Sequence, residues 1–475
     1  MNSCTICLLA LGSFSGLSVA QDLSRFAGDW SVCDISSPAR LQELFFDPTT
    51  SMTRVGEDSS DVAEGAEIIT DIFFENPLFT STRLFSIAND GAVTGEESGE
   101  FFEPAPNRLL FFDGSDAVNV YSNTSNNILA TAVESTDSLN LSLIVKRPTA
   151  MTLTDIVDSW TLFVLGNPRD VETTLSGGRV VDTFFNSESE LFMANINILG
   201  DGTFNGAFSG TVIVNSPGIV SFTTDPTEDP VMFQFNDSLN VGIATNGDSE
   251  DDDDQDFIIA VRSSSALTQA DLAGRWRIHA IAMPDDLTEV YRNTTTGATR
   301  ETGSDDFPGP GEELIDVFFV DSFFETRLQI NVLPTGAVSG SLAGSFTLNP
   351  DNTVTFDFGE DPIALLPNGD GTFMAGGIAG MGREDTNQLI TLIKTSDDIP
   401  GSEEEALDLR TFREGVALFL SWNDTDITAL GASETLLPAS FAPVMDSIGT
   451  GAHVLDLTSP LPAAQFFGVI EVEED

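Results

Sequence analysis

Three short runs decide the fold: Leu141-Ser-Leu-Ile-Val-Lys146, Phe257-Ile-Ile-Ala-Val-Arg262 and Leu389-Ile-Thr-Leu-Ile-Lys394. Each is an apolar stretch that ends in a cation. The whole chain has only two lysines, and both occupy this terminal position. Self-similarity of this kind indicates repeated structural units, which have to be recognised before any other fold assignment.

Other landmarks recur in the same order around these runs. A tryptophan precedes each run, in the frames Phe26-Ala-Gly-Asp-Trp30, Ile156-Val-Asp-Ser-Trp160 and Leu272-Ala-Gly-Arg-Trp276. An aspartate followed by a Phe-Phe pair comes next, at Asp71, Asp182 and Asp316. A hairpin with two glycines four residues apart then follows, beginning at Gly91, Gly202 and Gly336. We therefore expect three homologous units at residues 21–150, 151–265 and 266–398.

The pattern within each unit is that of β-structure. Short β-branched and aromatic runs alternate with Gly, Asn, Asp and Pro, and helical periodicity is scarce. About eight strands in some 120 residues favour an up-and-down barrel, because closure of the sheet removes exposed edges. A sandwich is the second choice. A propeller is less favoured because the repeat is too long for one blade. The predicted fold class is all-β, with three tandem eight-stranded barrels.

The tryptophan and the terminal cation resemble a motif of the lipocalin (calycin) superfamily. Gly28-Asp-Trp30 and Gly274-Arg-Trp276 match its Gly-x-Trp in the first strand, whereas Asp158-Ser-Trp160 lacks the glycine. Lys146, Arg262 and Lys394 match its basic residue in the last strand. The resemblance covers residues 23–396 and implies lipocalin-like barrels in which the cation packs across the indole and closes one barrel end.

The aspartate before the Phe-Phe pair suggests a third partner for each cation. If that segment is the second barrel strand, the first strand lies between it and the last strand. We therefore expect a Trp–cation–Asp cluster at one end of each barrel, and the alternative is that the aspartates face water. The three clusters would be Trp30, Asp71 and Lys146; Trp160, Asp182 and Arg262; and Trp276, Asp316 and Lys394.

The connection between the tryptophan and this aspartate differs among the units. It encloses about 40 residues in the first and third units but only about half as many in the second. The favoured interpretation is a tolerated insertion, since added loop length costs little entropy. The alternative follows from the resemblance: in lipocalin-like barrels this connection covers the open mouth, so units one and three would carry lids.

Composition and the chain ends limit the setting of the protein. The net charge of −56 repels nucleic acid and anionic lipid, while 41% hydrophobic residues exclude global disorder. Residues 1–20 resemble a secretory signal peptide, whose removal leaves Cys33 alone and no intrachain disulfide. No later apolar run is long enough to span a membrane. We expect a secreted, periplasmic or cell-envelope protein of bacterial origin.

Residues 401–475 break the repeat pattern. Gly415-Val-Ala-Leu-Phe-Leu-Ser-Trp422 and Gln465-Phe-Phe-Gly-Val-Ile-Glu-Val472 both read as strands. The region resembles a degenerate fibronectin type III module, and we expect a small β-rich C-terminal domain.

Residue types argue against most catalytic chemistry. With only two histidines, in different modules, and one mature cysteine, nearly every histidine triad, Cys–His pair or zinc cage is excluded. We expect no catalytic residue and no cofactor, although carboxylate-only hydrolysis remains open. A weak calcium candidate is the acidic run Asp251, Asp252, Asp253 and Asp254, which reads better as a solvated turn.

The sequence therefore favours an exported, non-enzymatic protein with a structural, adhesive or surface-binding role toward an envelope or extracellular component. The second reading is a carrier that holds a small apolar ligand inside phenylalanine-lined barrels. The third, and least favoured, is a carboxylate-based hydrolase.

Overall fold

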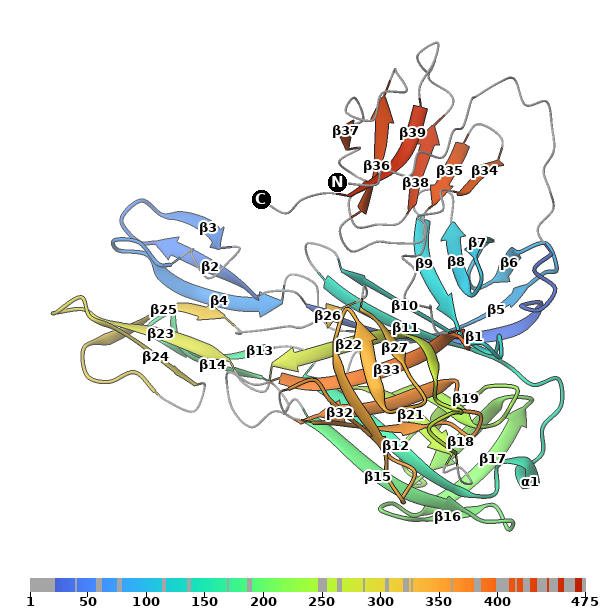
Figure 1. The fold of residues 1–475 in the computed structure, drawn as a ribbon. Coiled ribbons are helices and arrows are strands. Elements are labelled where there is room, and N and C mark those ends of the chain that lie inside the picture. Colours follow the sequence, from blue (N-terminus) through green and yellow to red (C-terminus); the bar gives the residue numbers. More distant parts are fainter. Residues whose placement is uncertain are drawn as a thin grey trace.

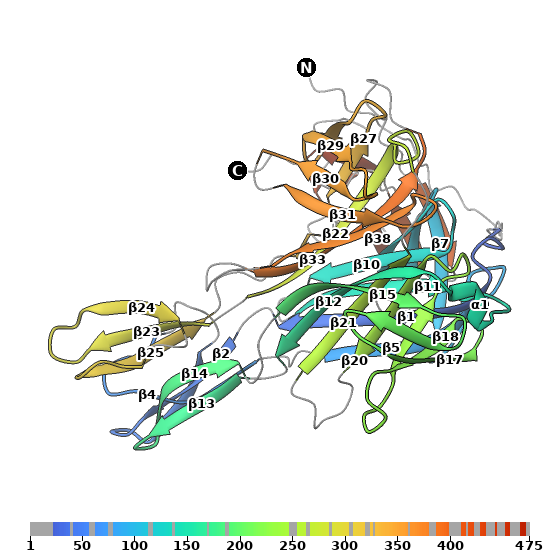
Figure 2. The ribbon, with the colours of Figure 1, turned by 90° about the horizontal axis from the view of Figure 1, so that it is seen from below.

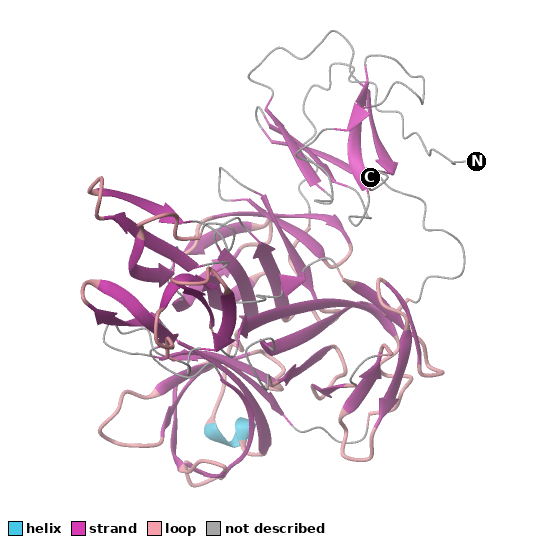
Figure 3. Ribbon diagram, turned by 90° about the vertical axis from the view of Figure 1, so that its left-hand side faces the viewer, coloured by secondary structure: helices cyan, strands magenta, loops and turns pink. Residues whose placement is uncertain are grey.

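The computed structural model describes residues 22–398 apart from short internal gaps, together with the backbone of six strands between residues 410 and 471. The gaps in the main part are residues 39–40, 57–61, 75–78, 113–116, 135–137, 169–170, 186–189, 247–253, 263–266, 285–286, 304–306, 319–323, 326–327, 360–361 and 380–385. Strands dominate the described chain (Figure 3), and its helix α1 (Leu153–Ile156) has a single turn. No helix in this part of the chain is long and apolar enough to cross a membrane.

The first two units each form a closed antiparallel barrel of eight strands. The first barrel consists of β1 (Gly28–Pro38), β5 (Phe79–Ile87), β6 (Ala92–Gly95), β7 (Gly99–Ala105), β8 (Arg108–Phe112), β9 (Ala117–Ser122), β10 (Ile128–Glu134) and β11 (Ser138–Lys146). The second consists of β12 (Ser159–Pro168), β15 (Glu190–Ile198), β16 (Thr203–Gly206), β17 (Gly210–Ser216), β18 (Ile219–Thr223), β19 (Val231–Phe235), β20 (Val241–Asn246) and β21 (Asp254–Arg262).

The third unit closes in the same way, because its first strand pairs with its last. Its second position is shared by two short strands, β26 and β27, which both pair with β22. The strands are β22 (Gly274–Pro284), β26 (Phe324–Glu325), β27 (Gln329–Val332), β28 (Ala337–Gly340), β29 (Gly344–Leu348), β30 (Val354–Asp357), β31 (Ile363–Pro367), β32 (Phe373–Ile378) and β33 (Thr386–Ser396). The predicted fold class, three tandem eight-stranded barrels, is confirmed.

The hairpin glycines do what the sequence predicted. Gly91, Gly202 and Gly336 have φ angles of 95°, 83° and 88°. A residue with a side chain is disfavoured there, so these positions fix tight turns at equivalent places in the three units.

The three barrels pack against one another through one shared core. In β1, Trp30 and Val32 point into the first barrel, whereas Cys33 and Ile35 point outward into the shared core. The first and last strands of the other units alternate in the same way. Because both faces of these strands are buried, their sequences are almost continuously apolar, which explains the runs that reveal the repeat.

The strand that carries the Phe-Phe pair is not a barrel strand. It belongs to an insertion between the first and second barrel strands, which forms a separate small sheet in each unit. These sheets are β2 (Leu41–Asp47), β3 (Met52–Gly56) and β4 (Ile68–Phe74); β13 (Val171–Ser176) and β14 (Arg179–Phe185); and β23 (Thr288–Asn293), β24 (Thr299–Gly303) and β25 (Glu312–Phe318). The interpretation of the aspartate-Phe-Phe segment as the second barrel strand was therefore wrong.

The three insertions come together in one body, which we call the insertion domain. Residues from all three share a hydrophobic core, including Phe45 and Ile72, Val171 and Val180, and Tyr291. The domain projects to one side of the barrels in both views of the ribbon (Figures 1 and 2). The long connections, for which the alternatives were a tolerated insertion and a lid over the barrel mouth, thus pack against one another.

The C-terminal region contains two three-stranded sheets. One has the order β34 (Arg410–Glu414), β35 (Ala417–Ser421), β38 (Ala452–Asp456), and the other has the order β37 (Ala442–Pro443), β36 (Thr428–Ser433), β39 (Phe466–Glu471). Both predicted strands are present, within a residue or two at the N-terminal ends. The fibronectin type III resemblance stays a prediction.

Candidate interaction site

Each tryptophan lies directly opposite the terminal cation of its unit. Trp30 pairs with Lys146, Trp160 with Arg262 and Trp276 with Lys394 in the antiparallel ladders. The Lys146 ammonium lies 5.9 Å from the centre of the Trp30 ring, and the Arg262 guanidinium lies 5.7 Å from that of Trp160. Cation–π attraction at such distances contributes roughly 0.5–2 kcal/mol.

The same two side chains also hold the segment that closes the base of each barrel. The indole N–H of each tryptophan donates to the carbonyl four residues earlier: Phe26, Ile156 and Leu272. The cation donates to the carbonyl five residues before the tryptophan: Arg25, Asp155 and Asp271. Because both donors act on one backbone turn in every unit, the pair is a structural cap on the barrel end.

The second unit lacks the motif glycine and has an ion pair at this place. In the first unit, a β-carbon on Gly28 would lie 3.2 Å from Lys146 Cε, so the lysine stem passes over the bare backbone. In the second unit Asp158 occupies this position, and its carboxylate accepts from Arg262 Nε at 2.8 Å. Arginine and aspartate thus replace lysine and glycine together.

The aspartates of the expected Trp–cation–Asp clusters lie elsewhere, so that part of the hypothesis was wrong. Asp71, Asp182 and Asp316 belong to β4, β14 and β25 of the insertion domain, not to barrel strands. Asp71 is exposed, whereas Asp182 and Asp316 are buried. In the barrels, Lys394 pairs instead with Asp397, at 2.7 Å.

Glutamates link the insertions of different units. Glu43 of the first unit accepts a hydrogen bond from Val317 N of the third, at 2.7 Å. Glu289 of the third unit accepts from Thr183 N of the second, also at 2.7 Å. Both glutamates are at most 3% exposed. Two equivalent bonds therefore run from one insertion to the next around the domain.

The first of these bonds lies beside a second buried carboxyl group. Burial and the adjacent Asp316, which also hydrogen-bonds to Glu43, raise the pKa of Glu43 to about 9. Two carboxyl groups this close cannot both ionise at low cost, so Glu43 keeps its proton near neutral pH. The pair lies inside a packed core rather than at a barrel mouth, where the hydrolase hypothesis requires it.

Among the described residues, no equivalent bond runs from the second insertion to the first. The position equivalent to Glu43 and Glu289 in the second unit is Thr173, as the strand register shows. The amide that it would bind, Ile72 N, is satisfied by the carboxylate of its neighbour Asp71 at 3.1 Å. Sequence reasoning missed this site, although a signal exists: Glu43, Thr173 and Glu289 all lie thirteen residues after the unit's tryptophan.

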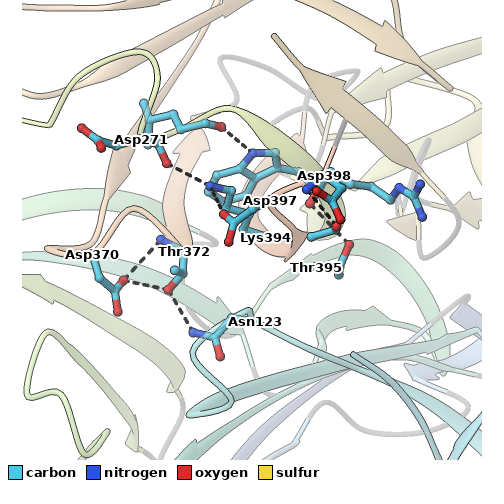
Figure 4. A network of polar contacts seen from close by, with 12 residues as sticks. Asn123, Asp271, Asp370, Thr372, Lys394, Thr395, Asp397 and Asp398 are labelled. Atoms are coloured by element: carbon cyan, nitrogen blue, oxygen red, sulfur yellow. Dashed lines mark hydrogen bonds and ion pairs between the residues drawn. The ribbon is translucent and has the colours of Figure 1, made fainter. Parts of the chain in front are cut away.

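An open polar recess of about 620 Å³ lies between the first and third barrels. Figure 4 shows polar contacts among the side chains at this recess, among them Asp370, Thr372 and Lys394. The Asp370 carboxylate accepts from Thr372 Oγ1 at 2.7 Å and from Ser125 Oγ at 3.3 Å. Asn123 Nδ2 donates to Thr372 Oγ1 at 3.0 Å and so joins the two barrels. These contacts make the recess a joint between barrels.

Asn123 belongs to a repeat that sequence reasoning also missed. Asn123, Asn236 and Asn368 each accept, through the side-chain oxygen, from the backbone amides four and five residues later. The loop Asn368-Gly-Asp-Gly-Thr is accordingly a hairpin turn between β31 and β32.

His279 faces the first barrel from β22. It is fully buried, and its ring centre lies 5.9 Å from that of Tyr121. Burial lowers the pKa of His279 to about 3, with a smaller contribution from the positive charge of Arg277. Neither imidazole nitrogen has a hydrogen-bond partner among the described residues.

The calcium candidate cannot be placed. Asp251, Asp252 and Asp253 lie outside the described residues, as does the side chain of Asp254, where β21 begins. The part of the chain that is described contains no group of three or more side chains suited to a metal ion.

Comparison with known proteins adds little to this geometry. No family model and no curated protein match the chain. Among solved structures, the chain is similar to the isotype 1 transferrin binding protein B from serogroup B Neisseria meningitidis, with 9% identity, 76% of each chain covered and a TM-score of 0.17. At that TM-score the similarity carries no argument about function.

Proposed function

We propose that this chain is an exported, non-enzymatic protein that binds a partner at a cell envelope or outside the cell, through its insertion domain. The observation that carries the proposal is the fusion of three insertions, far apart in the sequence, into one projecting domain with a common core. A tolerated loop insertion does not need to share a core with two others. Binding surfaces are commonly built from such segments on a rigid base.

Exposed apolar side chains support this assignment. Met52, Leu175 and Phe307, which are 69%, 58% and 65% exposed, come one from each insertion. An apolar side chain that a partner covers adds to the free energy of binding, so these three are the residues to alter first.

The barrel interiors favour a role as a rigid support for the insertion domain over a role as a ligand carrier. The second barrel contains a chain of aromatic rings in which Phe222 and Phe233 are 4.8 Å apart and Trp160 and Phe235 are 5.1 Å apart. The first and third barrels are filled by equivalent clusters. A carrier needs an apolar lumen of roughly 300 Å³ or more. Native mass spectrometry of the protein purified from its own source tests this point, since a co-purified lipid would favour the carrier.

Binding of fluorescently labelled chain to intact cells of the source organism tests the proposed function. The test variant carries Met52→Ser, Leu175→Ser and Phe307→Ser. The matched control carries Met193→Ser and Ile213→Ser on the second barrel, where the side chains are 64% and 59% exposed. We expect the insertion-domain variant to lose binding and the control to retain it. Absence of binding by the unaltered chain, or equal losses in both variants, would contradict the proposal.

A further inference from the structure

The insertion domain has two complete sheets and one incomplete sheet. In the first and third units the central strand, β2 or β23, has a neighbour on each side. In the second unit the equivalent strand β13 pairs with β14 alone. No described strand occupies the position that β3 and β24 take in the other two sheets. Within the described part of the chain, no strand therefore pairs with the second edge of β13.

The open edge leaves an apolar side chain uncovered. Leu175 is 58% exposed, whereas the residues at the equivalent positions, Phe45 and Tyr291, are completely buried. Phe45 is covered by Arg54 of β3, whose guanidinium lies 4.1 Å from the ring centre. Tyr291 is covered by Arg300 of β24, at 4.8 Å. In both complete sheets, an arginine of the neighbouring strand therefore packs over the side chain at this position.

The incomplete hairpin is held firmly in place. Val171 and Val180 lie in the common core, and Thr183 N donates to the buried Glu289. A strand edge that is fixed in this way offers a preformed ladder of backbone donors and acceptors, so a peptide that pairs with it orders only itself.

We propose that the free edge of β13 accepts an extended, arginine-containing segment of a separate protein as a third strand, with the arginine packed over Leu175. This inference rests on the proposed function and names its binding edge and the chemistry of its partner. Strand addition of this kind takes its affinity from main-chain hydrogen bonds and its selectivity from side-chain contacts.

Charge selects a basic partner over a second copy of the same chain. The chain carries a net charge of −56, so two copies repel each other, while a basic segment is attracted. Exposed Glu172, on the strand itself, adds a local acidic contact. The arginines of β3 and β24 each also pair with a glutamate, Glu67 and Glu312. In the second unit Gly178 occupies the position of these two glutamates, so the hairpin has no carboxylate at that place.

The experiment uses a synthetic peptide that copies residues 50–56, Thr-Ser-Met-Thr-Arg-Val-Gly, as the probe. Hydrogen exchange of the full chain is measured with this peptide and with a peptide in which its arginine is glutamate. We expect the first peptide to slow exchange in β13 with a Kd of roughly 1 mM or below, and the second to bind about tenfold more weakly. The variant Leu175→Lys, altered at an exposed position, should repel the arginine peptide.

A filled-edge variant provides the second arm. Residues 294–311, which contain β24, replace Gly177 and Gly178, so that the chain itself supplies the missing strand. We expect this variant to lose peptide binding and most of its binding to source cells, while its melting temperature does not fall. Failure of the peptide to protect β13, or undiminished peptide binding by the filled-edge variant, would overturn the inference.

The two proposals fail separately. If the unaltered chain binds cells and the filled-edge variant binds them equally, the insertion domain acts through another surface and the edge inference is wrong. If the filled-edge variant abolishes self-association of the pure chain, a second copy occupies the edge, which also overturns the inference. Neither result touches the comparison of insertion-domain and barrel variants on which the proposed function depends.

Discussion

At the scale of single residues, the same task is performed by different side chains in different units. Lys146 and Lys394 run past a glycine to reach a backbone carbonyl, whereas Arg262 reaches its carbonyl and also pairs with Asp158. The cap therefore depends on compatible pairs of residues rather than on a fixed motif. Exchanging one member of a pair should therefore lower the free energy of unfolding by more than the loss of that residue's own contacts.

Gly274→Ala tests this dependence. Gly274 has a φ of 147°, and an added β-carbon would collide with the Ser396 carbonyl oxygen and with Lys394 Cε. We expect a loss of more than about 2 kcal/mol, visible as a lower melting temperature. Gly297→Ala is the matched control, since it also has a positive φ, of 72°, but no atom within 4 Å of the added carbon. Equal losses would show that backbone strain alone accounts for the effect.

Glu43→Gln should change the pH dependence of stability. In the folded chain Glu43 keeps its proton up to about pH 9, whereas its ordinary pKa in the unfolded chain is 4.5. The unfolded chain loses this proton first, so the contribution of Glu43 to stability is full below pH 4.5 and declines until pH 9. Glutamine mimics the protonated form, so the variant should melt higher than the parent at pH 8 and no lower at pH 5.

Glu67→Gln is the control with the opposite sign. Hydrogen bonding to Arg54 lowers the pKa of Glu67, so its contribution is present at neutral pH and is lost on acidification. This variant should therefore melt at or below the parent temperature at pH 8. Because Glu67 is only partly buried, the effect should be at most about 1 kcal/mol.

At the scale of elements, the insertions contrast with the barrels. Every barrel strand except the two-residue β26 has a neighbour on each side, whereas β13 and β14 pair only with each other. A two-stranded hairpin is marginal by itself, so this one depends on its contacts with β4 and β25 and on the shared core.

Hydrogen exchange should show this contrast in the absence of any partner. We expect amides of β13 and β14 to exchange at least about tenfold faster than those of β23 and β25, because fewer ladders must open to release them. Amides of β1, β12 and β22 should be the slowest, since both faces of these strands are buried. Mass spectrometry of proteolytic fragments resolves these elements, and equal rates in β13 and β23 would contradict the expectation.

The sequence predicts the barrels well and the insertions poorly, for physical reasons. Trp30 and Lys146 have counterparts at fixed places in all three units. This recurrence identifies the first and last strands of each barrel, which pair with each other. The Phe-Phe strand has the same alternation as a barrel strand, and alternation does not say which neighbour a strand takes. Asp182 and Asp316 were therefore placed in the wrong sheet. The shared core between insertions depends on contacts between units, which no pattern within one unit encodes.

At the scale of the whole molecule, the barrels form one body. Phe163, Leu165, Phe257 and Ile259 of the second unit all face the core shared by the three barrels. This surface is apolar and continuous, so a unit separated from its neighbours would expose it to water.

Expression of residues 151–265 alone tests the unity of the three barrels. We expect the isolated second unit to self-associate or precipitate, whereas residues 22–398 should be monomeric on gel filtration. Replacing Phe163 and Ile259 by threonine should restore solubility to the isolated unit, because both side chains face the shared core. A well-behaved monomer of the unaltered unit would show that the shared core contributes little.

Because the three units are covalently linked, their association does not depend on the concentration of the protein. Three separate subunits with the same contacts would dissociate on dilution, because their association follows mass action. Here each barrel is tethered beside its neighbours, at an effective concentration set by short connecting segments and not by the abundance of the protein. A single molecule, however sparse its surroundings, therefore keeps its threefold core and the composite domain that three insertions build upon it.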